Sequence, residues 1–372
     1  MRILILSWRC PCNPRAGGAE SLTYEIARRL IVKGHSVEWF SASFRGAPSR
    51  EVLDGISVVR AGRQWSVHLR AFWRYRRCIR RHFDLVIDEV NTMPFFTPLW
   101  SDISVRMIIF QLAREVWWHE SPFPLSAVGY LLEPAYLQFY RHTPVITISR
   151  STATDLRRLG FQGHIAIVPV GISAPPAVPA VKEKEPTFLY VGRLAPSKRI
   201  RHLIQALALF RESNGRGTLW VAGSGSARYI NSLRELSIRL NVADHVIFRG
   251  RVTDAERSHL MTAAHALLMA SVREGWGMVI TEANSCGTPA IGYDVPGLRD
   301  AIVNNVTGLL VAPEPAALSR AMTRLMCDDH MRLRLSHECR RRSSAFTFDS
   351  MADAVHHELL KAYNVSQSAK AV

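Results

Sequence analysis

The chain has 372 residues, 48% of them hydrophobic and 21% charged, a composition of ordinary globular proteins at a length that suits two domains better than one. No apolar run reaches the roughly 18 residues that a membrane span needs, and the first residues are too soon interrupted for a signal peptide, so we expect neither. The formal net charge of +16 excludes an acidic protein and indicates an anionic partner: nucleic acid, an acidic membrane surface or a phosphorylated substrate.

The first strand runs into a glycine pair. Residues 2–7 predict a buried parallel strand, and Gly17-Gly18-Ala19-Glu20 precedes an amphipathic helix over residues 22–33. Strand, Gly-Gly turn and helix is the order of a phosphate-cradling loop, because glycine lets the backbone approach a ligand closely. The same pattern also fits a plain connection between a strand and a helix.

A basic stretch lies between Arg60 and His82, with eight arginines and no acidic residue. If it is helical, four of the arginines form one stripe, and the aromatic side chains cluster elsewhere. Such a helix suits an anionic membrane surface, and the alternative is a core-packed helix with a solvated basic face. The stripe consists of Arg70, Arg74, Arg77 and Arg81.

An aromatic segment follows the strand predicted at residues 105–110. It contains Arg114, Glu115 and His119 beside two tryptophans. A single histidine in such surroundings is more often a packed or interfacial residue than a catalytic one.

A second α/β unit begins after a proline-rich linker at residues 171–186. Its first strand, residues 188–191, leads into the turn Gly192-Arg193-Leu-Ala-Pro-Ser-Lys198. Arg193 and Lys198 can converge there on one diphosphate, the arginine as a planar fork and the lysine as a point charge. The alternative is two solvated basic residues on an ordinary turn.

The most informative stretch follows an apolar strand at residues 266–270. A turn carrying Glu274 leads into a helix that begins near Met278, so the backbone N–H groups of Gly277, Met278 and Val279 lie at a helix N-terminus, where phosphate binds. Glu282 lies about two helical turns further on. Carboxylates accept hydrogen bonds from sugar hydroxyls, so the pattern predicts a nucleotide-sugar site. A buried strand, a solvated turn and an ordinary helix would give the same pattern.

Two of these motifs resemble those of the retaining glycosyltransferases of family four. The stretch from Glu274 to Glu282, with its continuation Gly287-Thr-Pro289, is similar to the E-x7-E signature, and Gly192-Arg193-Leu-x-x-x-Lys198 is similar to the diphosphate clamp. The resemblance implies the GT-B fold: two Rossmann-like parallel-sheet domains that face each other across a cleft, with a C-terminal helix that crosses back to the first domain. We expect an acceptor-binding domain, a linker, a nucleotide-sugar-binding domain, a crossover helix and a disordered tail, at residues 1–170, 171–186, 187–345, 346–363 and 364–372.

The resemblance also implies roles for single residues. Arg193 and Lys198 would stabilise the leaving diphosphate and Glu274 would bind hydroxyls of the donor sugar. The predicted donor-binding residues are Gly17, Gly18, Gly192, Arg251, Val252, Gly277, Met278, Val279 and Glu282.

The acceptor side departs from the family pattern. The family usually has a histidine at the end of the strand where Phe110 or Gln111 stands here, so the acceptor-side residues predicted in its place are His119, Arg114 and Glu115. No Asp-x-Asp motif or ligand cluster occurs in the sequence, and we expect neither a metal nor another cofactor.

The sequence therefore predicts a retaining, metal-independent glycosyltransferase that moves a hexose-type sugar from a UDP- or GDP-sugar to a lipid-linked or cell-surface glycan. The six scattered cysteines form no C-x-x-C pair, which favours a reduced, cytoplasmic protein. The basic stretch adds the expectation that the protein is peripheral at the membrane. The alternatives are a nucleotide-sugar epimerase or phosphorylase on the same scaffold, a scaffold without activity, and a basic nucleic-acid-binding protein. A Glu-bearing site would repel a nucleic-acid backbone, so we do not expect nucleic acid as a partner.

Overall fold

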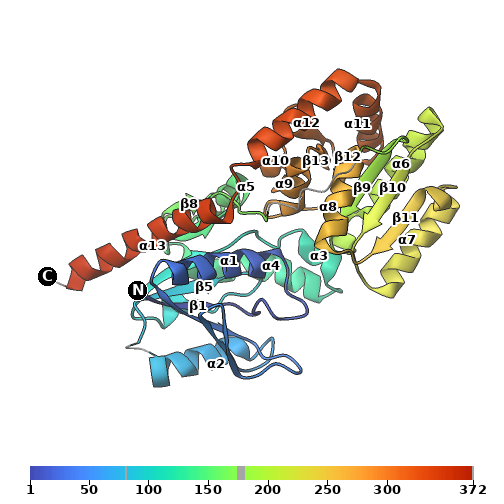
Figure 1. The fold of residues 1–372 in the computed structure, drawn as a ribbon. Coiled ribbons are helices and arrows are strands. Elements are labelled where there is room, and N and C mark those ends of the chain that lie inside the picture. The colour runs from blue at the N-terminus through green and yellow to red at the C-terminus, as the bar shows by residue number, and fades with distance from the viewer. Residues whose placement is uncertain (80–81, 174–180, 371–372) are drawn as a thin grey trace. The chain divides into compact units, whose positions relative to one another are not determined.

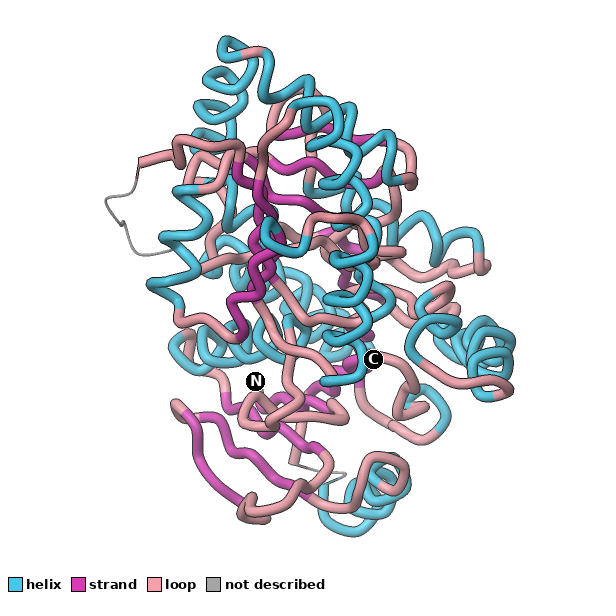
Figure 2. The backbone as a smooth tube through the Cα atoms, turned by 90° about the vertical axis from the view of Figure 1, so that its right-hand side faces the viewer, coloured by secondary structure: helices cyan, strands magenta, loops and turns pink. Residues whose placement is uncertain are grey.

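The computed structural model describes residues 1–79, 82–173 and 181–370, which form two compact α/β units (Figure 1). Unit 1 comprises Met1–Arg114, Ala127–Gly171 and the chain from Phe348 on, and unit 2 comprises Glu115–Ser126 and Ile172–Thr347. In each unit, strands alternate with helices along the chain (Figure 2). The fold is therefore the predicted pair of Rossmann-like domains.

Unit 1 is built on an eight-stranded sheet in the order β3-β4-β2-β1-β5-β6-β7-β8. Every neighbouring pair is parallel except β3 with β4, which is antiparallel. The central strands β1 and β5 are buried on both faces, which explains why they read as continuous apolar runs. The strands are β1 (Arg2–Leu6), β2 (Ser36–Ser41), β3 (Arg50–Leu53), β4 (Ile56–Arg60), β5 (Leu85–Glu89), β6 (Ser104–Ile108), β7 (Val145–Thr147) and β8 (Ile165–Ile167).

The final helix of the chain belongs to unit 1, as the predicted crossover requires. There α13 packs against α1 (Figure 1). Two ion pairs, each at 2.6 Å, join α13 to α1 and to the residue after it: Arg29 to Asp349 and Lys33 to Asp353. The α-helices assigned to unit 1 wholly or for most of their length are α1 (Gly18–Val32), α2 (Val67–Arg74), α4 (Leu125–Leu137), α5 (Arg150–Arg158) and α13 (Phe348–Lys370).

Two expectations for the ends of segments differ from the structure. Helix α13 continues to Lys370, whereas residues 364–372 were expected to be disordered. This end of the chain contains neither glycine nor proline, so nothing in the sequence stops the helix. Residues 371–372 and part of the predicted linker, residues 174–180, lie outside the described residues.

The predicted arginine stripe is wrong in part. Helix α2 ends at Arg74 and passes into a π-helical turn at Tyr75–Ile79, which changes the number of residues per turn and therefore the phase of the stripe. Nη2 of Arg74 donates to Oε1 of Glu38 at 2.9 Å, so this guanidinium is paired within the unit, while Arg70 and Arg77 are exposed. The fourth member of the stripe, Arg81, lies outside the described residues.

Unit 2 contains a fully parallel six-stranded sheet in the order β11-β10-β9-β12-β13-β14. Its core is apolar and closely buried, with Phe188, Leu207 and Leu267 at 0% exposure. The strands are β9 (Thr187–Val191), β10 (Thr218–Ala222), β11 (Val246–Gly250), β12 (Ala266–Met269), β13 (Ala290–Tyr293) and β14 (Gly308–Val311).

Eight α-helices of unit 2 lie within the described residues. One of them, α3, comes from the first half of the chain, because the short segment Glu115–Ser126 makes its contacts with unit 2 although it was expected within residues 1–170. These helices are α3 (Val116–Glu120), α6 (Ile200–Asn214), α7 (Ala227–Arg239), α8 (Asp254–Ala263), α9 (Met278–Ser285), α10 (Leu298–Ala301), α11 (Pro315–Cys327) and α12 (Asp329–Ser343).

Candidate active site

The candidate site in unit 2 lies where the direction of strand addition reverses. After β9 the chain adds β10 and β11 on one side of the sheet, and β12, β13 and β14 lie on the other side. The two turns singled out from the sequence follow β9 and β12, which are neighbours. In open parallel sheets, ligands bind outside the carboxyl ends of the strands at such a reversal. The topology therefore places both motifs at the edge where sheets of this kind bind ligands.

The turn after β9 is held by close backbone packing. A Cβ on Gly223, in the neighbouring turn after β10, would lie 1.8 Å from the carbonyl oxygen of Gly192, so the two turns touch only because residue 223 is glycine. The hydroxyl of buried Tyr190 donates to the carbonyl oxygen of Arg193 at 2.8 Å. The backbone of the turn is thus fixed, while the Arg193 side chain is 64% exposed.

The structure brings together two predicted residues that are 76 positions apart. Nζ of Lys198 lies 2.5 Å from Oε1 of Glu274, and the Ser271 hydroxyl donates to the same oxygen at 2.7 Å. The Glu274 turn is closely packed, because a Cβ on Gly297 would lie 2.1 Å from the carbonyl oxygen of Glu274. The lysine and the carboxylate therefore converge from the turns after β9 and β12.

The N-terminus of α9 follows this carboxylate directly. Gly277 caps the helix in the left-handed region at φ +88°, and the indole N–H of Trp276 donates to the Thr281 hydroxyl at 2.9 Å. No hydrogen bond to another described residue is donated by the backbone N–H groups of Gly277, Met278 and Val279. These donors, together with the helix dipole, suit a bound phosphate.

Glu282 lies on α9 and is mostly buried, with a side chain 16% exposed. Burial raises the pKa of its carboxyl group, and the positive charge of Arg257, whose Nε lies 3.7 Å away, opposes that rise. The two carboxylates have different partners, because Glu282 lies near Arg257 and Glu274 is paired with Lys198.

Helix α3 supplies two carboxylates to the turns of unit 2. Oε2 of Glu115 accepts from Nε of Arg273 at 2.9 Å. Oε2 of Glu120 accepts from Nη1 of Arg193 at 3.2 Å, and its Oε1 accepts from the Ser197 hydroxyl at 2.5 Å. Sequence reasoning named Glu115 for the acceptor side but missed Glu120, Ser197 and Ser271. Ser197 lies inside the turn after β9 and Ser271 lies three residues before Glu274, so their positions in the sequence could have identified them as site residues.

The other predicted acceptor-side residues fall in different units. His119 belongs to unit 2, where burial and the charge of Arg199 lower its pKa. Arg114 belongs to unit 1, where its guanidinium lies 4.2 Å from the ring centre of Tyr130 and its backbone N–H donates to Oε2 of Glu133 at 2.7 Å.

The Gly17-Gly18 turn of unit 1 has its own acidic partner. The N–H of Gly17 donates to Oε2 of Glu20 at 2.8 Å, and Glu20 is only 3% exposed. Glu89, at the end of β5, is also buried, and burial followed by the negative charge of Glu20 raises its pKa to about 8. Sequence reasoning missed Glu89, although an acidic residue at the end of an apolar strand is a readable signal.

The last predicted donor contacts follow β11. Arg251 is exposed and Val252 is half-buried against the core of unit 2, so their backbone is accessible at the carboxyl end of the sheet. No group of three His, Cys, Asp or Glu side chains in the described part of the chain could hold a metal ion.

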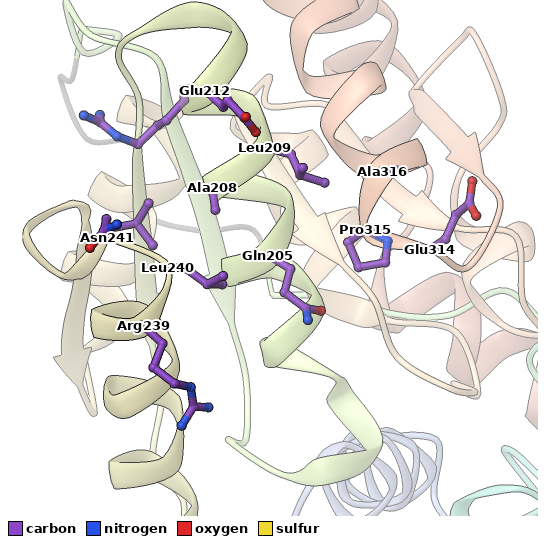
Figure 3. A pocket seen from close by; sticks show the side chains of 12 residues that line it. Gln205, Ala208, Leu209, Glu212, Arg239, Leu240, Asn241, Glu314, Pro315 and Ala316 are labelled. Atoms are coloured by element: carbon purple, nitrogen blue, oxygen red, sulfur yellow. The ribbon is translucent and has the colours of Figure 1, made fainter.

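A pocket of unit 2 lies away from these residues. It has a volume of about 870 Å³ and lies on α6, with Gln205, Leu209 and Glu212 along the helix and Glu314 and Pro315 at the start of α11 (Figure 3). None of the residues discussed above lines it. Its lining includes the N-terminus of α11 but lacks the paired lysine and carboxylate, so we do not assign the donor to it.

The chain is similar in sequence or in fold to several known proteins. The chain is 35% identical over 194 residues to a D-inositol 3-phosphate glycosyltransferase of Frankia alni, covering 50% of this chain and 46% of the relative, so it spans less than half the length of that curated relative. Sucrose-phosphate synthase of Thermosynechococcus elongatus has the same fold, with a TM-score of 0.83 at 21% identity over 98% of this chain and 100% of that one. Anabaena Alr3699/HepE in complex with UDP-glucose follows with a TM-score of 0.75 at 18% identity, over 97% and 100%.

Two family models match consecutive parts of the chain. "Glycosyltransferase Family 4" matches residues 16–174 and "Glycosyl transferases group 1" matches residues 175–342. The first range contains the Gly17-Gly18 turn, and the second contains the turns after β9 and β12. The chain therefore belongs to the family-four glycosyltransferases.

Proposed function

We propose that this protein transfers a hexose-type sugar from a nucleotide diphosphate donor, a UDP- or GDP-sugar, to a hydroxyl group of a glycan acceptor. The observation that carries the proposal is the convergence of Lys198 and Glu274, 2.5 Å apart, beside the N-terminus of α9. A cation and an uncapped helix end suit a diphosphate, and a carboxylate suits the sugar attached to it. A relative of the same fold that holds UDP-glucose supports this class of donor.

Each residue of unit 2 then has a distinct task. Negative charge builds on the β-phosphate as the donor bond breaks, and Arg193, Lys198 and the first N–H groups of α9 stabilise it. Glu274 binds hydroxyls of the donor sugar, and Glu282 binds the ribose. The positive charge at this place is supplied by side chains and a helix dipole, so the reaction needs no metal ion.

We further propose that the reaction retains the configuration at the anomeric carbon. A glycosidase-like scheme requires a carboxylate nucleophile and an acid/base on opposite sides of the ring. Here Glu274 is paired with Lys198 and Glu282 lies near Arg257, so neither is placed as a free nucleophile. The acceptor oxygen instead bonds to the anomeric carbon on the face that the phosphate leaves. The bond from carbon to phosphate oxygen breaks, and that oxygen takes the acceptor's proton.

A panel of donors tests the proposal. UDP-glucose, UDP-galactose, UDP-N-acetylglucosamine and GDP-mannose are compared by thermal shift and by slow donor hydrolysis, without added metal. One donor should raise the melting temperature and be hydrolysed. No response to any donor would overturn the proposal, and a changed sugar in the absence of acceptor would identify an epimerase.

The acceptor is proposed to be lipid-linked, because α2 presents an apolar and basic surface. Leu69 and Trp73 lie on α2 and are 60% and 48% exposed, and Trp65, in the turn before the helix, is 68% exposed. Exposed Arg70 and Arg77 lie on the same helix and the turn after it. Tryptophan and arginine together suit the interface of an anionic membrane. No helix in the described part of the chain is long and apolar enough to span a bilayer.

Liposome sedimentation tests membrane docking. We expect binding to rise with the fraction of anionic lipid and to fall as salt screens the charges. The double variant Trp65→Ala/Trp73→Ala should bind at least about tenfold more weakly, because two interfacial anchors are lost. The matched control is Val32→Ala/Val52→Ala, which removes two exposed apolar side chains elsewhere in unit 1. Equal binding of both double variants would contradict the proposal.

A further inference from the structure

Helix α3 places a carboxylate on the residues to which we assign the donor diphosphate. The two oxygens of Glu120 accept from Nη1 of Arg193 at 3.2 Å and from the Ser197 hydroxyl at 2.5 Å. Ser197 is 4% exposed, so its hydroxyl is directed by the surrounding turn rather than by solvent. The Glu120 side chain itself is 24% exposed. Both donors at this end of the turn are thus occupied by one acidic side chain.

A second ion pair anchors the same helix. Glu115, at the start of α3, is paired with Arg273, whose side chain is only 7% exposed and lies in the turn after β12. α3 is therefore held at one end by the turn after β12 and at the other by the turn after β9. Five residues of helix cannot hold a position by their own hydrogen bonds, so the two ion pairs and the hydrogen bond from Ser197 contribute to where Glu120 lies.

A carboxylate and a phosphate group accept hydrogen bonds from the same kinds of partner. Each offers two or more anionic oxygens to an arginine fork and to a hydroxyl donor. A phosphate bound by Arg193 and Ser197 would need the positions that the Glu120 oxygens hold. The two anions therefore exclude each other.

We propose that Glu120 is a built-in competitor of the donor diphosphate, which must displace it before Arg193 can bind the donor. This inference rests on the proposed function of the site. When the competent state is only partly populated, the apparent affinity for a ligand falls by that fraction. Glu120 therefore lowers the apparent affinity of every phosphate ligand that must displace it, and it does so by the same factor.

The opposite role for Glu120 predicts the opposite result. If it merely held Arg193 in the orientation that the donor needs, its removal would weaken donor binding. The sign of the change in affinity separates a competitor from a positioning residue.

Binding of inorganic pyrophosphate and of UDP, measured by calorimetry on the full chain, tests the proposal. Glu120→Gln removes the charge, and Glu120→Ala removes the oxygens as well. Both should bind pyrophosphate and UDP about threefold to tenfold more tightly than the wild type, the range expected when one partly exposed ion pair no longer competes. Inorganic phosphate bound at Arg193 should gain by the same factor, because the fraction of free protein in which Glu120 is displaced does not depend on the ligand.

Two controls make the result specific. Glu314→Gln removes an exposed carboxylate from another part of the same unit, so it reports the effect of net charge alone. In an Arg193→Ala background, Glu120→Gln should lose most of its effect, because the shared partner is gone.

The outcomes divide cleanly. Unchanged or weaker binding of pyrophosphate and UDP by both Glu120 variants would overturn the proposal that Glu120 competes with the donor. An equal gain in affinity with Glu314→Gln would also overturn it. Absence of pyrophosphate and UDP binding in the wild type and in every variant would instead overturn the proposed function on which it rests.

Discussion

Lys198 is the residue on which the proposed chemistry depends most. Among the residues that the structure describes, Lys198 is the only lysine paired with Glu274. Its ammonium group would face the charge that develops on the leaving phosphate. We expect Lys198→Ala to lower turnover at saturating donor by about 100-fold, the usual loss when one preorganised donor is removed. Lys361→Ala, at an exposed lysine paired with Glu358, is the control. A change of about threefold or less, under about 1 kcal/mol, would exclude the assigned role.

Glu89 gives the stability of unit 1 a pH dependence. Its ordinary pKa of 4.5 rises to about 8 in the folded protein, so the folded state holds a proton that the unfolded state has lost. Stability should therefore fall as pH rises from about 4.5 to about 8 and then level off, by an amount on the order of 3 kcal/mol. Urea unfolding at pH 5 and pH 8 measures it. In Glu89→Gln the fall should be clearly smaller, and an unchanged fall would show that Glu89 does not bind this proton.

Single residues also show the limits of sequence reading. Lys198 and Glu274 could be predicted because their residue types and the flanking turns are informative on their own. Glu120 could not, because its partners lie 73 and 77 positions away and only the folded chain brings them together. An acidic residue beside two tryptophans carries no local sign of such a contact.

At the scale of an element, the turn after β12 depends on one backbone position. Gly297 has φ +84°, and a Cβ there would overlap the carbonyl of Glu274. Gly297→Ala should cost more than the roughly 1 kcal/mol of left-handed strain, and it should weaken donor binding because Glu274 must move. Gly215→Ala is the matched control, with φ +71° and open space around the Cβ. Thermal unfolding and donor titration of both variants give the comparison, and equal effects would contradict this account.

The regular elements could largely be predicted, because buried parallel strands and amphipathic helices have distinct periods. The failures occurred where tertiary contacts override local pattern. In α2, the π-helical turn at Tyr75–Ile79 and the pairing of Arg74 with Glu38 broke an arginine stripe that assumed a regular helix. In α3, a short segment joined unit 2 through ion pairs that its own sequence does not indicate.

At the scale of the whole molecule, unit 1 needs the last helix of the chain. Met351, Ala352, Val355 and Leu359 of α13 are all completely buried. Removing their apolar surface should cost on the order of 5 kcal/mol, a large part of the stability of a domain. A chain ending at residue 347 should therefore unfold or aggregate, whereas a chain ending at residue 361 should keep a near wild-type melting temperature. Equal melting temperatures of the two truncated chains would contradict the assignment of α13 to the core of unit 1.

The two-unit organisation could be predicted from the two successive runs of strand and helix, and from motifs that resemble one family. Sequence alone did not reveal which unit takes each connecting segment. That choice depends on the balance of a few ion pairs and buried side chains, as with Glu115 and Glu120.

Besides the short excursion at residues 115–126, the chain leaves unit 1 after residue 171 and returns at residue 348, and these two crossings lie together. Gly171 lies against Phe348, where a Cβ would come within 2.4 Å of the ring, and the next residues on either side, Ile172 and Thr347, form a parallel bridge. Residues 172–347 therefore resemble an insertion with adjoining ends. A segment with such ends can be exchanged between homologous proteins at a single pair of joints, which offers evolution and protein engineering a way to change most of unit 2 while keeping unit 1.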